Sequence, residues 1–229
     1  MNMVEIKDIG KTYRQGKVLV HALDGITLSI KTGEFTALSG PSGSGKTTLL
    51  NLIGGLDTPS RGTIILDNDP ITDLSQSQLA DIRLNKIGFV FQAYNIIPVL
   101  SARENVEYVM LMQGVPAKKR TERAKAVLDD VGLSGMHDRR PAELSGGQQQ
   151  RVAVARAIVS NPAIVLADEP TANLDSHTGQ GLLEMMARMN EQRNVTFIFS
   201  THDPMVMGFS RRIIRLKDGK VTDDLQKQR

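Results

Sequence analysis

The chain contains 229 residues, of which 40% are hydrophobic and 23% are charged, as in an ordinary globular protein. Its 28 basic residues are mixed with 25 acidic ones to give a net charge of +3, so we expect no nucleic-acid partner. The lack of cysteine excludes disulfides and thiolate metal sites, and no apolar run is long enough to predict a membrane-spanning segment.

The first part of the chain is predicted to form antiparallel β structure. Its apolar, β-branched runs alternate with turn residues, and Asp24-Gly25 predicts a hairpin between two of the strands. A polar turn then leads into a short buried strand just before a glycine-rich loop. The expected antiparallel strands are residues 4–9, 18–23, 26–30 and 62–66, and further short strands are expected at residues 35–39 and 87–91.

Helical periodicity dominates the rest of the chain. Two continuous apolar runs, residues 164–167 and 195–200, interrupt it and predict strands that are buried on both faces of a parallel sheet. A final hairpin over residues 212–221 has its turn at Asp218-Gly219. Helices are expected at residues 48–56, 103–112, 117–128, 148–160, 178–189 and 204–209.

Together these elements predict a single α/β domain over residues 1–229. We expect a parallel-sheet core, an antiparallel β portion at 1–35 and 60–70, and a helical insertion at 93–145 that splits the core. The polar residues 225–229 are expected to be disordered.

The glycine-rich loop at residues 40–47 fits G-x-x-x-x-G-K-[ST], the pattern of a phosphate-binding loop. Its glycines let successive N–H groups face one anion, Lys46 adds a cation for the outer phosphates, and the Thr47 hydroxyl suits Mg²⁺. A chance match in a surface turn is the alternative, and the strand before the loop and the helix after it argue against that. The predicted nucleotide-binding residues here are Gly40, Pro41, Ser42, Gly43, Ser44, Gly45, Lys46, Thr47 and Thr48.

Two adjacent acids, Asp168 and Glu169, end the apolar run at residues 164–167. Carboxylates at the tip of a buried strand are costly unless they meet a cation or transfer a proton. Asp168 is therefore predicted to hold Mg²⁺ beside Thr47, and Glu169 to polarise the attacking water as a general base. The alternative is a solvated turn before Pro170.

A second anion site is predicted at the start of the helix after residue 145. Ser145 is a good N-cap, and the glycines after it expose backbone N–H groups at the helix N-terminus. Since the first loop already supplies what one phosphate tail needs, this site is predicted to serve the nucleotide of another molecule. An ordinary capped helix is the alternative. The residues are Ser145, Gly146, Gly147 and Gln148.

Six motifs follow one another along the chain, namely residues 40–47, Gln92, residues 144–148, Asp168-Glu169, Leu174-Asp175 and His202. In this order they resemble the ATP-binding-cassette ATPase family over nearly the whole chain. The resemblance implies a P-loop NTPase (RecA-like) core, ATP and Mg²⁺ as ligands, and ATP hydrolysis. It also implies that two copies pack head to tail with two ATP molecules between them.

The resemblance assigns further roles. Tyr13 would stack on adenine, although a plain turn tyrosine is the alternative. Gln92 would reach Mg²⁺ or water, and His202 would bind the γ-phosphate and hold Glu169 and water, unless it is a structural histidine. Asp175 would lie at the interface between copies. No role is predicted for the other histidines.

Residues 52–59, 88–92, 97–98 and 167–175 resemble most closely the lipoprotein-release and macrolide-export ATPases. This implies a separate integral-membrane permease that docks near residues 92–98, and a peripheral location on the cytoplasmic face of the inner membrane. Exposed Tyr94, Ile96 and Ile97 would form an apolar docking patch, or they would only pack the insertion together. A nucleotide-switched scaffold of the cell-division type and the cassette of a solute importer remain alternatives.

Overall fold

The computed structural model of the protein describes residues 1–16 and 18–227. The strands are β1 (Asn2–Gln15), β2 (Val18–Lys31), β3 (Phe35–Ser39), β4 (Arg61–Leu66), β5 (Asp69–Pro70), β6 (Ile87–Val90), β7 (Ile164–Asp168), β8 (Thr196–Thr201), β9 (Arg212–Lys217) and β10 (Lys220–Gln226). The helices are α1 (Lys46–Ile53), α2 (Gln76–Lys86), α3 (Ala102–Met112), α4 (Ala117–Asp130), the 3₁₀ turn η1 (Pro141–Glu143), α5 (Gly146–Ile158), α6 (Ser176–Arg193) and α7 (Pro204–Phe209).

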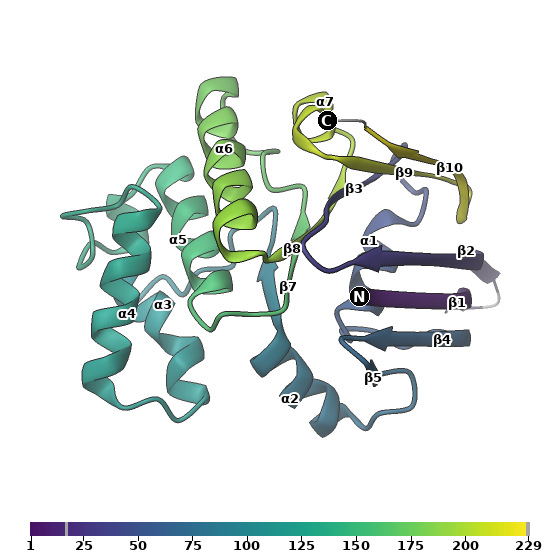
Figure 1. The fold of residues 1–229 in the computed structure, drawn as a ribbon, viewed down its shortest axis with the longest axis horizontal. Coiled ribbons are helices and arrows are strands. Elements are labelled where there is room, and N and C mark those ends of the chain that lie inside the picture. The colour runs from purple at the N-terminus through teal and green to yellow at the C-terminus, as the bar shows by residue number, and fades with distance from the viewer. Residues whose placement is uncertain (17, 228–229) are drawn as a thin grey trace.

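Two sheets organise the chain. A six-stranded sheet has the order β10-β9-β3-β8-β7-β6, in which neighbours from β9 to β6 are parallel, and a four-stranded antiparallel sheet has the order β2-β1-β4-β5. Figure 1 shows the antiparallel sheet on the right and the helical group α3, α4 and α5 on the left. The predicted α/β architecture, with its antiparallel portion and helical insertion, is confirmed.

The six-stranded sheet separates two hydrophobic clusters. Phe197 and Phe199 of β8 belong to the cluster that includes residues of α5 and α6, whereas Ile198 between them belongs to the cluster shared with α1 and the antiparallel sheet. This alternation is the period-two geometry of a strand, and it explains why β8 is apolar without interruption. Both faces of the sheet are therefore covered, and polar groups meet water at the strand ends.

The predicted hairpin at Asp24-Gly25 is wrong, because β2 passes through these residues as one continuous strand. The pairing with β1 changes there from Ile9 opposite Ile26 to Lys11 opposite Leu23, so β2 carries one extra residue. Gly25 has a φ of 70°, a conformation that a bulge and a hairpin turn can both require. The turn signal was real, but it marks a bulge.

Helix α2 was not predicted from the sequence. It begins at Ser75 with a capping box, in which the Ser75 hydroxyl accepts from the Gln78 backbone N–H and the Gln78 side chain accepts from the Ser75 N–H. Leu79 is its buried residue, so the helix lacks the apolar stripe on which periodicity depends.

The C-terminal hairpin of β9 and β10 is confirmed, with Asp218 and Gly219 both at positive φ in its turn. The prediction of a disordered tail from residue 225 is wrong for Leu225 and Gln226, which belong to β10. Lys227 donates from Nζ to the carbonyls of Met207 and Gly208 at 2.7 and 2.9 Å. Residues 228 and 229 lie outside the described part of the chain.

Candidate active site

The phosphate loop connects the end of β3 to the start of α1 and is packed tightly against two other strands. Gly40, at a φ of 152°, has no room for a Cβ because the carbonyl oxygen of Leu216 in β9 occupies its place. Gly45, at a φ of 100°, would place a Cβ 2.7 Å from the carbonyl oxygen of Ala22 in β2. Both positions need glycine, for conformation and for space. The curled backbone that the sequence pattern predicts is therefore present.

Lys46 crosses the loop and is buried. Its Nζ donates to the carbonyl oxygens of Gly40 at 2.8 Å and Pro41 at 3.0 Å. An ammonium has three donors, so one remains for an anion held by the loop. The first turn of α1 carries no acidic residue, and its N-terminal partial charge is not neutralised there. This end of the helix is suited to a phosphate group.

Thr47 and Asp168 meet where α1 faces the end of β7. The Thr47 Oγ1 donates to Oδ1 of Asp168 at 3.1 Å. A hydroxyl and a carboxylate oxygen at this distance are the donor set that Mg²⁺ takes together with phosphate oxygens and water. These two side chains fit the expected ion, and their role as ligands stays a prediction.

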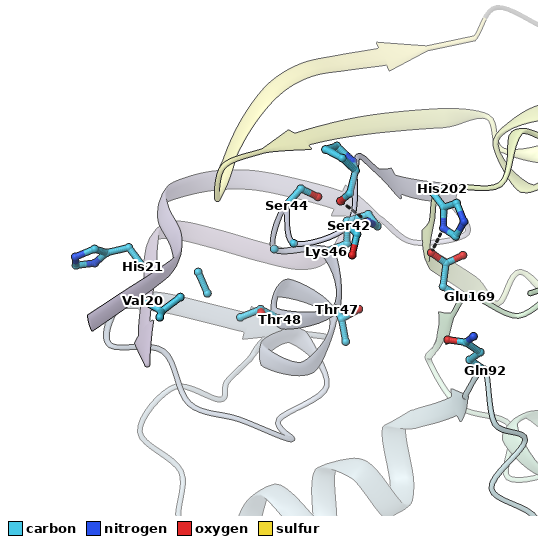
Figure 2. A pocket seen from close by; sticks show the side chains of 14 residues that line it. Val20, His21, Ser42, Ser44, Lys46, Thr47, Thr48, Gln92, Glu169 and His202 are labelled. Carbon is cyan, nitrogen blue, oxygen red and sulfur yellow. Dashed lines mark hydrogen bonds and ion pairs between the residues drawn. The ribbon is translucent and has the colours of Figure 1, made fainter. Parts of the chain in front are cut away.

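A cavity of about 560 Å³ lies over the phosphate loop. It is bounded by residues 41–48, Gln92, Glu169 and His202, and by three residues of β2. Figure 2 shows Lys46 and Thr47 on one side of this cavity, with Glu169, His202 and Gln92 on the other. The structure thus brings together residues that are up to 182 positions apart in the sequence, by the difference between positions 20 and 202.

Glu169 and His202 form a hydrogen-bonded pair at the carboxyl ends of β7 and β8. His202 Nδ1 lies 2.6 Å from Glu169 Oε1, and Thr201 donates from Oγ1 to Glu169 Oε2 at 3.1 Å. Because a carboxylate only accepts, His202 carries its hydrogen on Nδ1. Glu169 is 15% exposed and His202 72% exposed, so the histidine reaches furthest into solvent. The carboxylate is oriented on both oxygens, as a general base must be.

Glu169 also has a strained backbone. Its φ is 45°, in the left-handed region that a glutamate rarely adopts. Its N–H donates to the carbonyl of Ser200 at 2.9 Å, which continues the pairing of β7 with β8 past the end of the strand. This conformation costs free energy, and such strain clusters at functional sites.

Gln92 follows β6, and its side chain is exposed toward the cavity. Its backbone carbonyl accepts a hydrogen bond from Asn173 Nδ2 at 2.8 Å. The start of the helical insertion is therefore bonded to the loop that leads to Asp175.

Residues Ser145 to Gln148 and Asp175 lie outside the cavity around the phosphate loop. Ser145 caps α5 through a capping box with Gln148, and Asp175 caps α6 by accepting from the N–H and hydroxyl of Thr178 at 3.0 and 2.6 Å. The Thr178 hydroxyl bond holds the pKa of Asp175 below its ordinary value. Their predicted contacts with the nucleotide of a second copy stay predictions.

Tyr13 does not line the cavity, but it lies on β1 directly opposite Val20, which does. Its hydroxyl donates to Oδ2 of Asp57 at 2.7 Å. Burial, followed by the bond to Asp57, raises the pKa of Tyr13. Its stacking on adenine stays a prediction.

Sequence reasoning missed Val20, His21 and Ala22, which line the cavity from β2. His21, to which no role was assigned, has its Nδ1 3.0 Å from the Thr12 hydroxyl. The pairing of β1 with β2 and the hydrogen bond from the Asp24 N–H to the Gly219 carbonyl place this segment beside the loop, and no local motif signals it. Thr201 was also missed, although its position next to His202 at a strand end could have indicated it.

A second hollow of about 430 Å³ lies between α2, β6, α3 and α5. Arg83, Phe89, Val109 and Arg156 are among its lining residues. Arg156 donates to the carbonyls of Asn95 at 2.6 Å and Tyr94 at 3.1 Å, and burial lowers its pKa. This guanidinium fixes the path of the chain just after Gln92.

The expected exposed patch of Tyr94, Ile96 and Ile97 is wrong, because all three side chains are half-buried. Ile96 packs against the cluster formed with the helices, and the Tyr94 hydroxyl lies against α5 near Gly146. The alternative, in which these residues pack the insertion together, describes Ile96. Exposed apolar residues occur instead at Leu56, 46% exposed, and Val99, 72% exposed.

Among the described residues, 1–16 and 18–227, no helix combines the length and the hydropathy that crossing a bilayer requires.

Comparison with known proteins adds the family. The profile of the ABC transporter family matches residues 23–172. An ABC transporter ATP-binding protein of Methanocaldococcus jannaschii, MJ0796, is 46% identical over 223 residues, which are 96% of this chain and 95% of that protein. The macrolide export ATP-binding/permease protein MacB of Syntrophobacter fumaroxidans is 48% identical over 96% of this chain. The chain spans 31% of the length of that protein.

Comparison with solved structures gives the same family. The dimeric structure of a post-hydrolysis state of the MJ0796 cassette, bound to ADP and Pi, has a TM-score of 0.92 and 44% identity. The match covers 99% of this chain and all of that one. The phosphate loop, the acids at the end of β7 and the fold that joins them are those of an ATP-hydrolysing cassette. The chain therefore belongs to the ATP-binding-cassette family of transporter ATPases.

Proposed function

We propose that the protein is the ATP-hydrolysing subunit that drives a separate membrane permease, in the extrusion of lipoproteins, peptides or drugs. The observation that carries the catalytic part is the pair of Glu169 and His202, hydrogen-bonded at 2.6 Å on the opposite side of the cavity from Lys46. The extrusion role is supported by the 48% identity with a macrolide export protein.

Two copies would bind head to tail, with ATP between the phosphate loop of one and residues 145–148 of the other. Lys46 and the loop N–H groups would hold the phosphates, and Tyr13 would stack on the adenine. Mg²⁺ held by Thr47, Asp168 and Gln92 would neutralise charge on the outer phosphate oxygens. Glu169 would take a proton from the attacking water, while His202 would contact the γ-phosphate and keep Glu169 in place.

The hollow beside residues 92–98 is the proposed docking site of the permease. Arg83 and Arg156 line this hollow together with the rings of Phe89 and Phe91, and such a mixture of charged and apolar groups would suit a short protein segment. Phe91 lines this hollow and the next residue, Gln92, lines the nucleotide cavity, so docking and hydrolysis would be coupled. Such docking would hold the protein peripherally at the cytoplasmic face of the inner membrane.

Glu169→Gln tests the catalytic assignment. The amide keeps the size of the side chain but is not a base, so ATP binding is expected to persist while steady-state hydrolysis falls by about a hundredfold or more. Phosphate release and nucleotide binding should be measured on the same preparation, with the exposed Glu191→Gln as the matched control. Phosphate release at the parent rate would show that Glu169 is not the base.

The transport role has its own test. Affinity purification of the protein from membranes should recover an integral-membrane permease, and ATPase activity should rise in that complex. Recovery of division proteins with little turnover would favour the nucleotide-switched scaffold, and recovery with a solute-binding protein would favour the importer.

A further inference from the structure

Tyr13 is held by a charged pair that the proposed mechanism does not use. Lys11 donates from Nζ to Oδ1 of Asp57 at 2.6 Å and to the carbonyl of Thr58 at 2.7 Å. The Tyr13 hydroxyl donates to the other carboxylate oxygen of Asp57 at 2.7 Å. Oδ1 also accepts from the Thr58 backbone N–H at 2.7 Å, so the Tyr13 hydroxyl is the donor to Oδ2 and the other two donors share Oδ1. The carboxylate fixes the end of the tyrosine ring at a position set by α1, after which Asp57 comes.

The two faces of the Tyr13 ring are not equivalent. Lys11 Nζ lies 4.8 Å from the ring centroid, so one face is covered by a cation that is 9% exposed. A flat ligand must use the other face. Tyr13 pairs across the sheet with Val20, and the Thr48 hydroxyl lies close enough to lower the pKa of Tyr13 against the larger effect of burial. Val20 and Thr48 both line the nucleotide cavity, so the ring stands at its edge.

The protonation states of Asp57 and Tyr13 keep the hydrogen bonds between Lys11, Asp57 and Tyr13 in place. Burial alone would raise the pKa of Asp57, but the hydrogen bonds from Lys11 and Tyr13 hold this pKa below its ordinary value. Because the pKa of Tyr13 is raised, its hydroxyl keeps its hydrogen at neutral pH. At neutral pH the carboxylate is therefore an acceptor for Lys11, Tyr13 and the Thr58 N–H.

We propose that Asp57 is a positioning residue for nucleobase recognition, which anchors Tyr13 so that the ring face away from Lys11 meets the adenine. The inference rests on the proposed stacking of Tyr13. A tyrosine that is already fixed loses little side-chain entropy when a base stacks on it. More of the free energy of stacking therefore contributes to the binding affinity. We therefore expect Asp57 to strengthen the binding of the base and to leave the binding of the phosphates unchanged.

The test compares two ligands that differ by the base and sugar. Dissociation constants for ATP and for inorganic triphosphate, both with Mg²⁺, should be measured for Asp57→Asn, Tyr13→Phe, the double variant and Tyr13→Ala. Asparagine has the same shape but one acceptor in place of two, and phenylalanine keeps the ring but loses the hydroxyl. Asp67→Asn is the matched control, since Asp67 pairs with Lys86 at 2.8 Å, outside the cavity.

Asp57→Asn and Tyr13→Phe are each expected to raise the dissociation constant of ATP about fivefold and to leave that of inorganic triphosphate unchanged. The double variant should be no weaker than either single one, because both changes break the same contact. Asp67→Asn should change neither ligand. If Asp57→Asn lowers the melting temperature too far for binding measurements, Tyr13→Phe alone provides the comparison.

Equal losses for ATP and triphosphate would show that the cluster only stabilises the fold, and would overturn the proposal. An unchanged ATP affinity in Asp57→Asn, with a loss in Tyr13→Ala, would overturn it while leaving the stacking intact. If Tyr13→Ala also binds ATP normally, the stacking itself fails. Hydrolysis is judged separately by Glu169→Gln.

Discussion

Gly147 is confined by one methyl group of the neighbouring helix. A Cβ at this position in α5 would collide with Cγ2 of Thr178 in α6. Gly146 differs, because its Cβ would meet the Tyr94 hydroxyl at 2.9 Å, the end of a side chain that can move. Gly146 and Gly147 predicted an anion site, but packing against Thr178 is by itself a reason for glycine at position 147.

Gly147→Ala is expected to destabilise the protein by about 1–3 kcal/mol, because the methyl group forces α5 and α6 apart. Thr178→Ser removes the opposing methyl but keeps the hydroxyl that binds Asp175, so the double variant should recover most of the loss. Urea unfolding of the two single variants and the double variant measures this. Failure of Thr178→Ser to restore stability would show that the clash is not the cause.

The role of a residue could be predicted from the sequence where the residues that act together lie within one short motif. The phosphate loop and the acids after β7 could be identified because a strand, a turn and a charge lie next to each other in the sequence. The contacts of Tyr13 could not, since its partner Asp57 is 44 positions away and no pattern joins them. Thr201 likewise acts through Glu169, 32 positions away.

At the scale of elements, Asn105 ties α3 to the segment after Gln92. This fully buried side chain accepts from the Ile97 N–H at 2.7 Å and donates to three carbonyls, those of Ile97, Leu100 and Ser101. Four backbone groups near the end of the segment between β6 and α3 are thereby hydrogen-bonded although this segment has no regular structure.

Asn105→Ala is expected to cost about 2–4 kcal/mol of unfolding free energy, because it leaves the Ile97 N–H and the Leu100 carbonyl without their side-chain partner. Asn85→Ala in α2 is the control, since Asn85 is exposed and bonds to the Asp81 carbonyl of its own helix. That control should stay within about 0.5 kcal/mol of the parent protein. Equal stabilities for the two variants in urea titrations would contradict this account.

Elements were predictable in proportion to how much apolar surface they bury. The strands of the six-stranded sheet and the helices α3 to α6 have clear patterns, whereas α2 buries Leu79 and is held by its cap. Asp24-Gly25 was misread because positive φ at glycine serves a bulge and a turn equally well. Which one forms is decided by the pairing of β1 with β2.

At the scale of the whole molecule, residues 145–148 do not line the cavity over the phosphate loop of the same chain. A site that needs both must be made by two copies. Specific ATPase activity is therefore expected to rise with protein concentration and to fall on dilution below the dimer dissociation constant. A rate that does not depend on concentration would contradict the two-chain site.

Mixing two inactive variants tests the same point more sharply. Lys46→Ala removes the phosphate contact, and Ser145→Arg blocks the opposing surface, so each homodimer should be inactive. A mixed dimer contains one site with both defects and one with neither, and should recover part of the parent activity. A site made within one chain predicts no recovery. Circular dichroism of each variant alone confirms that both are folded.

The packing of Gly40 against Leu216 bears on which sequences this fold can tolerate. The obstacle to a side chain there is a main-chain oxygen of β9, which no substitution elsewhere can remove. A second mutation therefore cannot rescue a substitution at Gly40, whereas the clash at Gly147 can be relieved by changing Thr178. Gly43, with a φ of 79° and no atom near its Cβ position, meets only a conformational penalty, and asparagine is the substitution it should accept best. A saturation library of the loop would rank its glycines by what lies opposite each of them.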